Sequence, residues 1–209
     1  MTRSRTVPDL AGHCPQCFLR TKYCICSEVP RIETETNYII LRHNKEIMKS
    51  SNTGRIASLA LTKYELLDYG GRDQVFDPNI LQREDIWLLF PKQYDGKKLE
   101  DHAEYPTSPP KHLIVLDGTW RQARRMVNRI EILRKIPKLM LPTPQTFPER
   151  LRKAPHLWTL STIETIARSI ELFEDREKAE LLDKLFALFV KNFKEQRGWN
   201  QRLPSFLTY

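Results

Sequence analysis

The stretch that decides the fold covers residues 113–120 and reads Leu-Ile-Val-Leu-Asp-Gly-Thr-Trp. Its four aliphatic residues predict a short buried strand. Gly118 permits a sharp turn, and Thr119 is a suitable N-cap for a helix over about 119–135. Asp117 then lies at the carboxyl end of a buried strand, which is where ligands bind in open α/β sheets. The alternative is that Asp117 or Thr119 only caps the helix.

Similar apolar runs predict further strands along the chain. They are Tyr38–Leu41, Ile86–Phe90, Lys138–Leu141 and a possible strand end at His156–Leu160. Helical spacing of apolar residues predicts helices across 163–193 and after Asn52, where a helix starting at Thr53 is expected to carry Ile56, Leu59, Ala60 and Leu67 on one face. The proline-rich segments 92–111 and 142–155 predict loops. This alternation predicts an α/β fold with a mostly parallel sheet flanked by helices.

Composition points to a polyanionic partner. The 209 residues carry a formal net charge of +8, and a basic balance favours nucleic acid ahead of membrane. No apolar run approaches the roughly 20 residues of a membrane-spanning helix. The first five residues, Met1–Arg5, are not followed by the apolar segment of a secretory signal. We therefore expect a cytoplasmic protein.

All four cysteines lie within one short segment, as Cys14, Cys17, Cys24 and Cys26. In a reducing compartment such clustering favours a metal over disulfides. Two close pairs can complete a closed tetrahedral site, so the pattern predicts structural Zn²⁺. Four free thiols or an iron–sulfur cluster are the alternatives. We expect a zinc-binding knuckle over residues 1–30 and a catalytic domain over 31–209.

The helix after Asp117 separates two kinds of side chain. Its apolar residues share one broad face and comprise Ala123, Met126, Val127, Ile130 and Leu133. The opposite face carries the four arginines Arg121, Arg124, Arg125 and Arg129. Like charges at this spacing destabilise a helix slightly, and a merely solvated face usually includes acids. The stripe therefore favours contact with an RNA backbone.

At these residues the chain resembles the DTW-domain proteins, which are named for the motif Asp-x-Thr-Trp. The motif is present as Asp117, Thr119 and Trp120 and continues through Arg121–Met126. Ser161–Glu164 resembles the second signature of the family. Matching positions also include Arg42-His43 with Glu46, Asn52-Thr53-Gly54 and the cysteine cluster. The matches run from about residue 14 to 170, and in this order they are highly specific.

The resemblance implies a tRNA-uridine aminocarboxypropyltransferase that uses S-adenosylmethionine. Such enzymes attach a 3-amino-3-carboxypropyl group to N3 of uridine and release methylthioadenosine. The resemblance also implies a fold like the knotted SPOUT methyltransferases. The chain has no Gly-x-Gly-x-x-Gly after a strand, which is consistent with a cofactor site unlike that of Rossmann proteins.

The resemblance also implies roles for individual residues. Asp117 is a candidate base for uracil N3, although an ordinary aspartate pKa of about 3.9 is low for that task. The candidate catalytic set is Asp117, Thr119 and Trp120, where Trp120 stacks on a base or packs in the core. Candidate cofactor-binding residues are Leu116, Asp117, Arg124, Ser161, Thr162 and Glu164. Candidate substrate or RNA contacts are Arg42, His43, Asn52, Thr53, Arg55, Arg121, Arg125 and Arg129.

Several alternatives remain for these residues. Ser161 and Glu164 have the spacing of a capping box and need do no more than start a helix. An RNA methyltransferase of SPOUT type would differ only in the carbon transferred. The same transfer to rRNA is another alternative, and a zinc-containing RNA-binding module without catalysis is a third. The sequence leaves the modified uridine and the oligomeric state open.

Overall fold

The computed structural model describes residues 11–71, 76–90, 106, 108–142 and 160–198. One five-stranded sheet lies at its centre, in the order β2-β1-β4-β3-β5, and every neighbouring pair is parallel. The strands are β1 (Asn37–His43), β2 (Tyr64–Tyr69), β3 (Ile86–Leu89), β4 (His112–Asp117) and β5 (Lys138–Leu139). The predicted α/β fold with a parallel sheet is confirmed.

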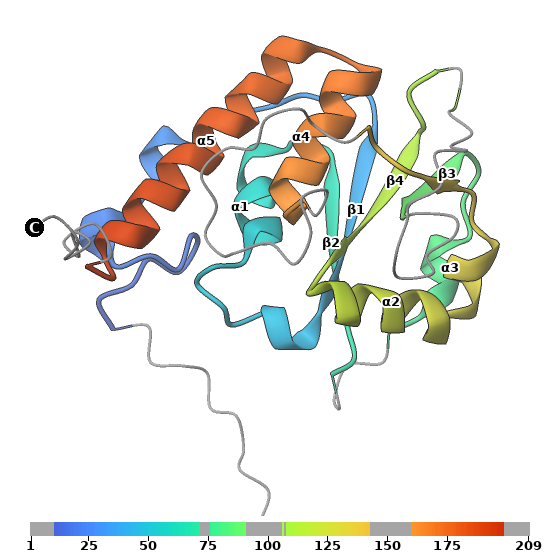
Figure 1. Cartoon of the computed structure of the whole chain (residues 1–209), viewed down its shortest axis with the longest axis horizontal. Coiled ribbons are helices and arrows are strands. Elements are labelled where there is room, and N and C mark those ends of the chain that lie inside the picture. Colours follow the sequence, from blue (N-terminus) through green and yellow to red (C-terminus); the bar gives the residue numbers. More distant parts are fainter. Residues whose placement is uncertain (1–10, 72–75, 91–105, 107, 143–159, 199–209) are drawn as a thin grey trace, which may run out of the picture.

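Helices cover the sheet (Figure 1). The α-helices are α1 (Thr53–Ala60), α2 (Trp120–Arg129), α3 (Glu131–Lys135), α4 (Thr162–Phe173) and α5 (Arg176–Glu195). Short 3-10 helices are η1 (Thr21–Tyr23), η2 (Cys26–Glu28), η3 (Asn44–Glu46) and η4 (Pro78–Leu81). Within the described ranges no helix is long and apolar enough to cross a membrane.

Alternating side chains divide the core into two layers. Tyr38 and Ile40 of β1 face a cluster that includes residues of α1, α4 and α5. Ile39 and Leu41 of the same strand face a second cluster with α2 and α3. Burial of both faces explains why the central strands read as continuous apolar runs rather than alternating ones.

Two sequence predictions were wrong in detail. Leu67 was placed on the helix after Asn52, but α1 ends at Ala60 and Leu67 lies on β2. This strand was missed because it is half-exposed at the sheet edge and includes charged residues, while Leu67 also fits helical spacing. The helix predicted over 119–135 is divided at Ile130, whose ψ of 101° ends α2 before α3 begins.

Other predictions fall on residues that the structure leaves undescribed. They are the possible strand end at 156–160, apart from Leu160, and most of the proline-rich segments 92–111 and 142–155. The predicted knot stays a prediction.

The cysteine segment packs against the helical layer. Leu19 and Ile25 are fully buried and belong to the same cluster as Phe189 of α5. The Asn192 side chain donates a hydrogen bond to the Tyr23 carbonyl at 3.1 Å. The segment, drawn in blue, lies beside the carboxyl-terminal half of α5 (Figure 1). It therefore shares a core with the domain that follows.

Candidate active site and cysteine knuckle

The Asp117 carboxylate joins three distant segments at the carboxyl edge of the sheet. Asn52 Nδ2 donates to Asp117 Oδ2, and Thr162 Oγ1 donates to Asp117 Oδ1, each at 2.6 Å. These partners lie 65 and 45 residues away in the chain. Asp117 is only 3% exposed. Both carboxylate oxygens are thus held by neutral donors inside the protein.

The two donors begin the helices α1 and α4. Asn52 is the N-cap of α1, and its Oδ1 accepts the Arg55 N–H at 2.7 Å. Thr162 is the first residue of α4. The amino ends of helices favour negative charge, so the carboxylate lies where both helices stabilise it.

Gly54 allows α1 to approach this closely. A Cβ built on Gly54 would lie 2.6 Å from Asp117 Cγ and within 2.9 Å of both carboxylate oxygens. Real Cβ atoms do not come this near a buried group. The requirement here is for space rather than for an unusual backbone conformation.

Burial raises the pKa of Asp117 above its ordinary value. The hydrogen bonds from Asn52 and Thr162 oppose this shift, as does the positive charge of Arg42, while the nearby Glu46 adds to it. A raised pKa moves the carboxyl group toward the range that proton transfer needs. The cost is a buried negative charge compensated mainly by dipoles.

Arg42 lies beside Asp117 but is engaged with another carboxylate. It is in register with Asp68 on β2 and with Asp117 on β4. Its Nε and Nη2 donate to the two oxygens of Asp68 at 2.7 and 3.1 Å. Arg42 is 7% exposed. This pair places a guanidinium near the site without leaving it open to solvent.

His43 ends β1 at the same edge. Its Nδ1 accepts the Lys45 N–H at 3.2 Å, so the ring caps the short helix η3. Burial lowers the pKa of His43, and among the nearby charges Lys45, Lys49 and Arg125 act in the same direction. The negative charge of Glu46 opposes this shift, so the histidine lies among charges of both signs.

The corner after Asp117 is capped as expected. Thr119 Oγ1 accepts the Gln122 N–H at 3.3 Å, and Gln122 Oε1 accepts the Thr119 N–H at 2.6 Å. Trp120 stacks on Phe90 with ring centroids 5.1 Å apart and planes 12° apart. One face of the indole is therefore covered by protein. Leu116 is partly buried in the layer formed with α2.

The amino end of α4 brings three predicted residues together. Glu164 Oε2 accepts the Ser161 N–H at 2.8 Å, as expected for a capping box. Ser161 Oγ is buried and has no hydrogen-bond partner within the described part of the chain. Thr162 is the residue that reaches Asp117. The helix start and the contact with Asp117 are therefore the same structural feature.

The two faces of α2 are arranged as predicted. Ala123, Met126 and Val127 are buried, as is Ile130, which ends the helix. The arginines Arg121, Arg124, Arg125 and Arg129 are exposed. No acid lies between Gly118 and Ile130. The exposed face of α2 is thus basic along its length.

Arg55 and Thr53 are both buried, so in this structure they do not form an exposed surface for RNA. Arg55 is 7% exposed, and its side chain donates to the carbonyls of Ile47 and Lys49. Thr53 is the first residue of α1 and is buried. Both sit within the loop-and-helix structure that supports Asn52. Their contact with RNA stays a prediction.

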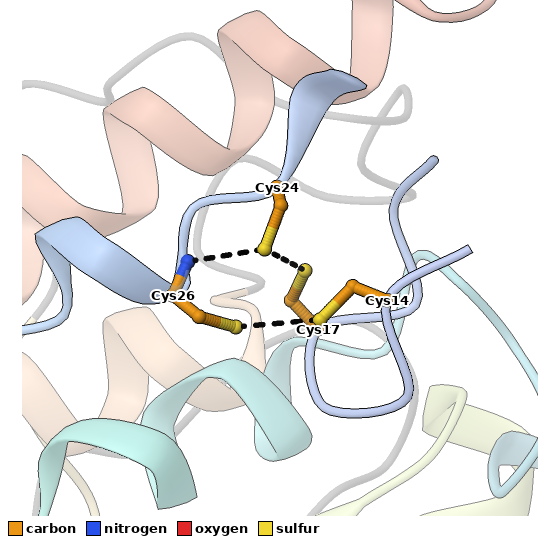
Figure 2. Close-up of side chains that lie close together, drawn as sticks. All are labelled: Cys14, Cys17, Cys24 and Cys26. Atoms are coloured by element: carbon orange, nitrogen blue, oxygen red, sulfur yellow. Dashed lines mark hydrogen bonds between the residues drawn. The ribbon is translucent and has the colours of Figure 1, made fainter. Parts of the chain in front are cut away.

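The four cysteine sulfurs converge on one point (Figure 2). All four Sγ atoms lie within 4.8 Å of one another, with Cys14–Cys26 at 3.6 Å and Cys17–Cys24 at 3.8 Å. A tetrahedral Zn²⁺ with Zn–S bonds of about 2.3 Å requires sulfurs about 3.8 Å apart. The Cys26 N–H also approaches Cys24 Sγ at 3.5 Å. The residues present therefore fit a closed metal site.

The thiols differ in their readiness to ionise. Burial raises the pKa of Cys14, but the backbone N–H groups of Cys17 and Gln16 and the neighbouring thiols outweigh it, so its pKa falls to about 7. Burial raises the pKa of Cys17 and of Cys26. A bound cation would remove this difference, because metal ligation requires thiolates.

No role was predicted from the sequence for three residues of the site. Gly54 was noted only as part of a motif, Glu46 is buried near Asp117, and Asp68 pairs with Arg42. Asp68 carried no signal because β2 itself was missed. Gly54 carried one, since glycine in the first turn of a predicted helix is unfavourable unless space is needed.

The fold and site define a class of α/β protein with a parallel sheet, a buried carboxylate at its carboxyl edge and a four-cysteine knuckle. A family model for the DTW domain matches residues 11–194. The chain belongs to the DTW domain family.

Curated relatives carry one activity in their names. The chain is 26% identical over 179 residues to tRNA-uridine aminocarboxypropyltransferase 2 of Drosophila melanogaster, covering 81% of this chain and 69% of that protein. It is 28% identical over 143 residues to tRNA-uridine aminocarboxypropyltransferase A of Arabidopsis thaliana, covering 57% and 52%. The protein named tRNA-uridine aminocarboxypropyltransferase 2 in Macaca fascicularis is 25% identical over 199 residues, covering 91% and 66%. No solved structure gives a significant match.

Proposed function

We propose that this protein is a tRNA-uridine aminocarboxypropyltransferase that transfers the 3-amino-3-carboxypropyl group of S-adenosylmethionine to N3 of a uridine. Family membership and the names of the relatives support the class of reaction. The observation that carries the proposal is the meeting of the segments at 52–54, 117–120 and 161–164 around one buried carboxylate. Binding of RNA alone does not require such a group.

The reaction demands positioning above all. When bound, S-adenosylmethionine supplies an electrophilic methylene next to its sulfonium. A C–S bond breaks and an N3–C bond forms, while the N3 proton passes to Asp117 or to water and methylthioadenosine departs. Holding the methylene rather than the methyl carbon in line with N3 selects the product, and such orientation supplies much of the rate.

Features of this chain fit the proposed donor. The buried Ser161 Oγ next to Thr162 is a polar atom that an incoming group would satisfy. The amino ends of α1 and α4 meet at this edge, and helix amino ends favour a carboxylate such as that of an amino acid. We assign donor binding to Leu116, Asp117, Arg124, Ser161, Thr162 and Glu164.

Asp117 is proposed to order the site. Its oxygens hold Asn52 and Thr162, and through them the starts of α1 and α4. For the carboxylate to accept the N3 proton itself, one of these hydrogen bonds has to be exchanged. The raised pKa of Asp117 makes it better suited to accept this proton than an aspartate with an ordinary pKa would be.

The basic surface beside the site is proposed to hold the tRNA. Arg121, Arg125 and Arg129 are exposed on α2, and Arg125 is close enough to His43 to lower its pKa. Lys45 adds an exposed positive charge from η3. Arg125 and Lys45 both act on the pKa of His43 at the carboxyl edge, so a phosphate backbone bound along α2 would bring a base toward Asp117.

Isotope transfer tests the proposal. Purified protein is incubated with tRNA and S-adenosylmethionine labelled either on the methyl group or on the carboxyl carbon, and the nucleosides are analysed by mass spectrometry. We expect label to enter uridine only from the carboxyl position. Entry from the methyl position would show a methyltransferase instead. Parallel reactions with rRNA test the substrate class.

A further inference from the structure

Phe18 connects the cysteine knuckle to the candidate active site. It directly follows Cys17 and has a φ of 62°, which is unusual for a bulky residue. The Arg55 guanidinium carbon lies 3.6 Å from the centroid of the Phe18 ring. Such a stacked cation–π contact is stronger when the cation is shielded from water, and Arg55 is almost fully buried.

Arg55 in turn holds the loop that precedes α1. Its Nη1 donates to the Lys49 carbonyl at 2.9 Å, and its Nη2 donates to the Ile47 carbonyl. Burial lowers the pKa of Arg55 to about 10, so the group remains charged at neutral pH. A planar guanidinium can bind two carbonyls and stack on a ring at once, whereas an ammonium cannot.

The backbone of Arg55 completes the path to Asp117. Its N–H donates to Asn52 Oδ1, and Asn52 Nδ2 donates to Asp117 Oδ2. Three consecutive contacts therefore lead from the knuckle to the buried carboxylate. The two hydrogen bonds are 2.7 and 2.6 Å long. Asn52, Arg55 and Asp117 are buried, and Phe18 is partly buried.

We infer that Phe18 and Arg55 are positioning residues through which the metal knuckle holds Asn52 against Asp117. A knuckle closed by a metal holds Phe18 in its left-handed conformation. The ring then keeps Arg55 on the Ile47 and Lys49 carbonyls. This inference rests on the proposed function, because it assigns the knuckle a role in transfer as well as in stability.

We call the contacts that lead from Phe18 through Arg55 and Asn52 to Asp117 the relay. Phe18→Gly tests the relay with little risk to the knuckle. Glycine adopts a φ of 62° readily, so the four cysteines should still bind metal, while the ring is removed. We expect an unchanged metal content, about tenfold faster hydrogen exchange in residues 47–55, and about a tenfold loss of transfer activity. Phe18→Tyr keeps a ring and should restore both to within about twofold.

Tyr23→Leu is the matched control, because it removes an aromatic ring from the same knuckle at a position where the ring contacts the Lys22 ammonium. It should leave exchange in 47–55 unchanged. If Phe18→Gly retained metal and showed wild-type exchange in 47–55, the relay would be refuted.

If Phe18→Gly released the metal, Arg55→Lys would decide, since it leaves the knuckle sequence intact. Faster exchange over 47–55 in Arg55→Lys would support the relay, and wild-type exchange would overturn it. Failure of the proposed function is distinguishable: the wild-type protein would then transfer nothing to tRNA, while the exchange results would still report on the relay.

Discussion

At the residue scale, Asp117 combines a favourable position for chemistry with an unfavourable one for stability. Its charge is buried among neutral donors, and its pKa is raised. A group whose folded-state pKa lies above the unfolded value favours folding fully only below the unfolded pKa, about 3.9 for aspartate. That contribution is lost as the pH rises through the folded-state pKa.

Asp117→Asn should therefore separate function from stability. We expect transfer to fall by about 100-fold or more, because the anion is lost, while the free energy of unfolding at pH 7 is unchanged or higher. The difference in stability should grow from about pH 4 up to the folded-state pKa and then level off. Denaturant unfolding across this pH range measures it, and a large loss of stability at pH 7 would contradict this view of Asp117.

Gly54→Ala provides a test of the close approach of α1. Alanine normally stabilises a helix interior by about 1 kcal/mol relative to glycine. Here its Cβ would meet the Asp117 carboxylate at 2.6 Å, so we expect destabilisation of about 1–3 kcal/mol. Thermal unfolding gives the sign directly, and a more stable Gly54→Ala protein would show that the approach is looser than described.

At the element scale, α2 has one apolar, buried face and one basic, exposed face. Met126 and Val127 close the core, whereas the exposed face carries only positive charge among its ionisable residues. Repulsion between its arginines costs a few tenths of a kcal/mol per pair. A polyanion bound along this face would offset that cost.

Replacement of Arg121 and Arg125 by alanine should weaken tRNA binding. For each phosphate that no longer meets an arginine, the slope of log K against log salt should become shallower by about one. Arg176→Ala on α5 is the control, because Arg176 is also exposed but is paired with Glu180. Filter binding across salt concentrations measures both quantities. Equal effects in the control would argue against a specific role for α2.

At the scale of the whole molecule, the knuckle and the α/β domain depend on each other. Cys17, Leu19 and Ile25 are fully buried in the cluster that includes α5. The Arg20 N–H donates to the Gln196 side chain near the end of α5. A metal bound by the four cysteines would therefore also order one layer of the main core.

Metal removal should therefore lower the melting temperature of the entire chain in a single transition. We expect Cys17→Ser or treatment with a strong chelator to cost several kcal/mol, since metal binding and folding of such segments are coupled. Calorimetry and metal analysis check this. Two separate transitions would instead indicate a knuckle that folds independently of residues 31–209.

Local sequence patterns were sufficient for most of the fold. Continuous apolar runs identified β1, β3, β4 and β5, because strands covered on both faces admit few polar residues. The Asn52 and Thr119 caps were also identified correctly, since capping depends on residues only three positions apart. The edge strand β2 was not, because half-exposure permits the same residue mixture as a helix.

By itself, the sequence determined the parallel α/β fold, the convergence of four cysteines and the two faces of α2, all of which follow from spacing within short segments. Only the tertiary structure decided that Gly54 lies against Asp117, that Arg42 pairs with Asp68 and that Phe18 stacks on Arg55. These contacts join residues far apart in the chain. Their geometry depends on how helices pack on the sheet, and no local pattern encodes that packing.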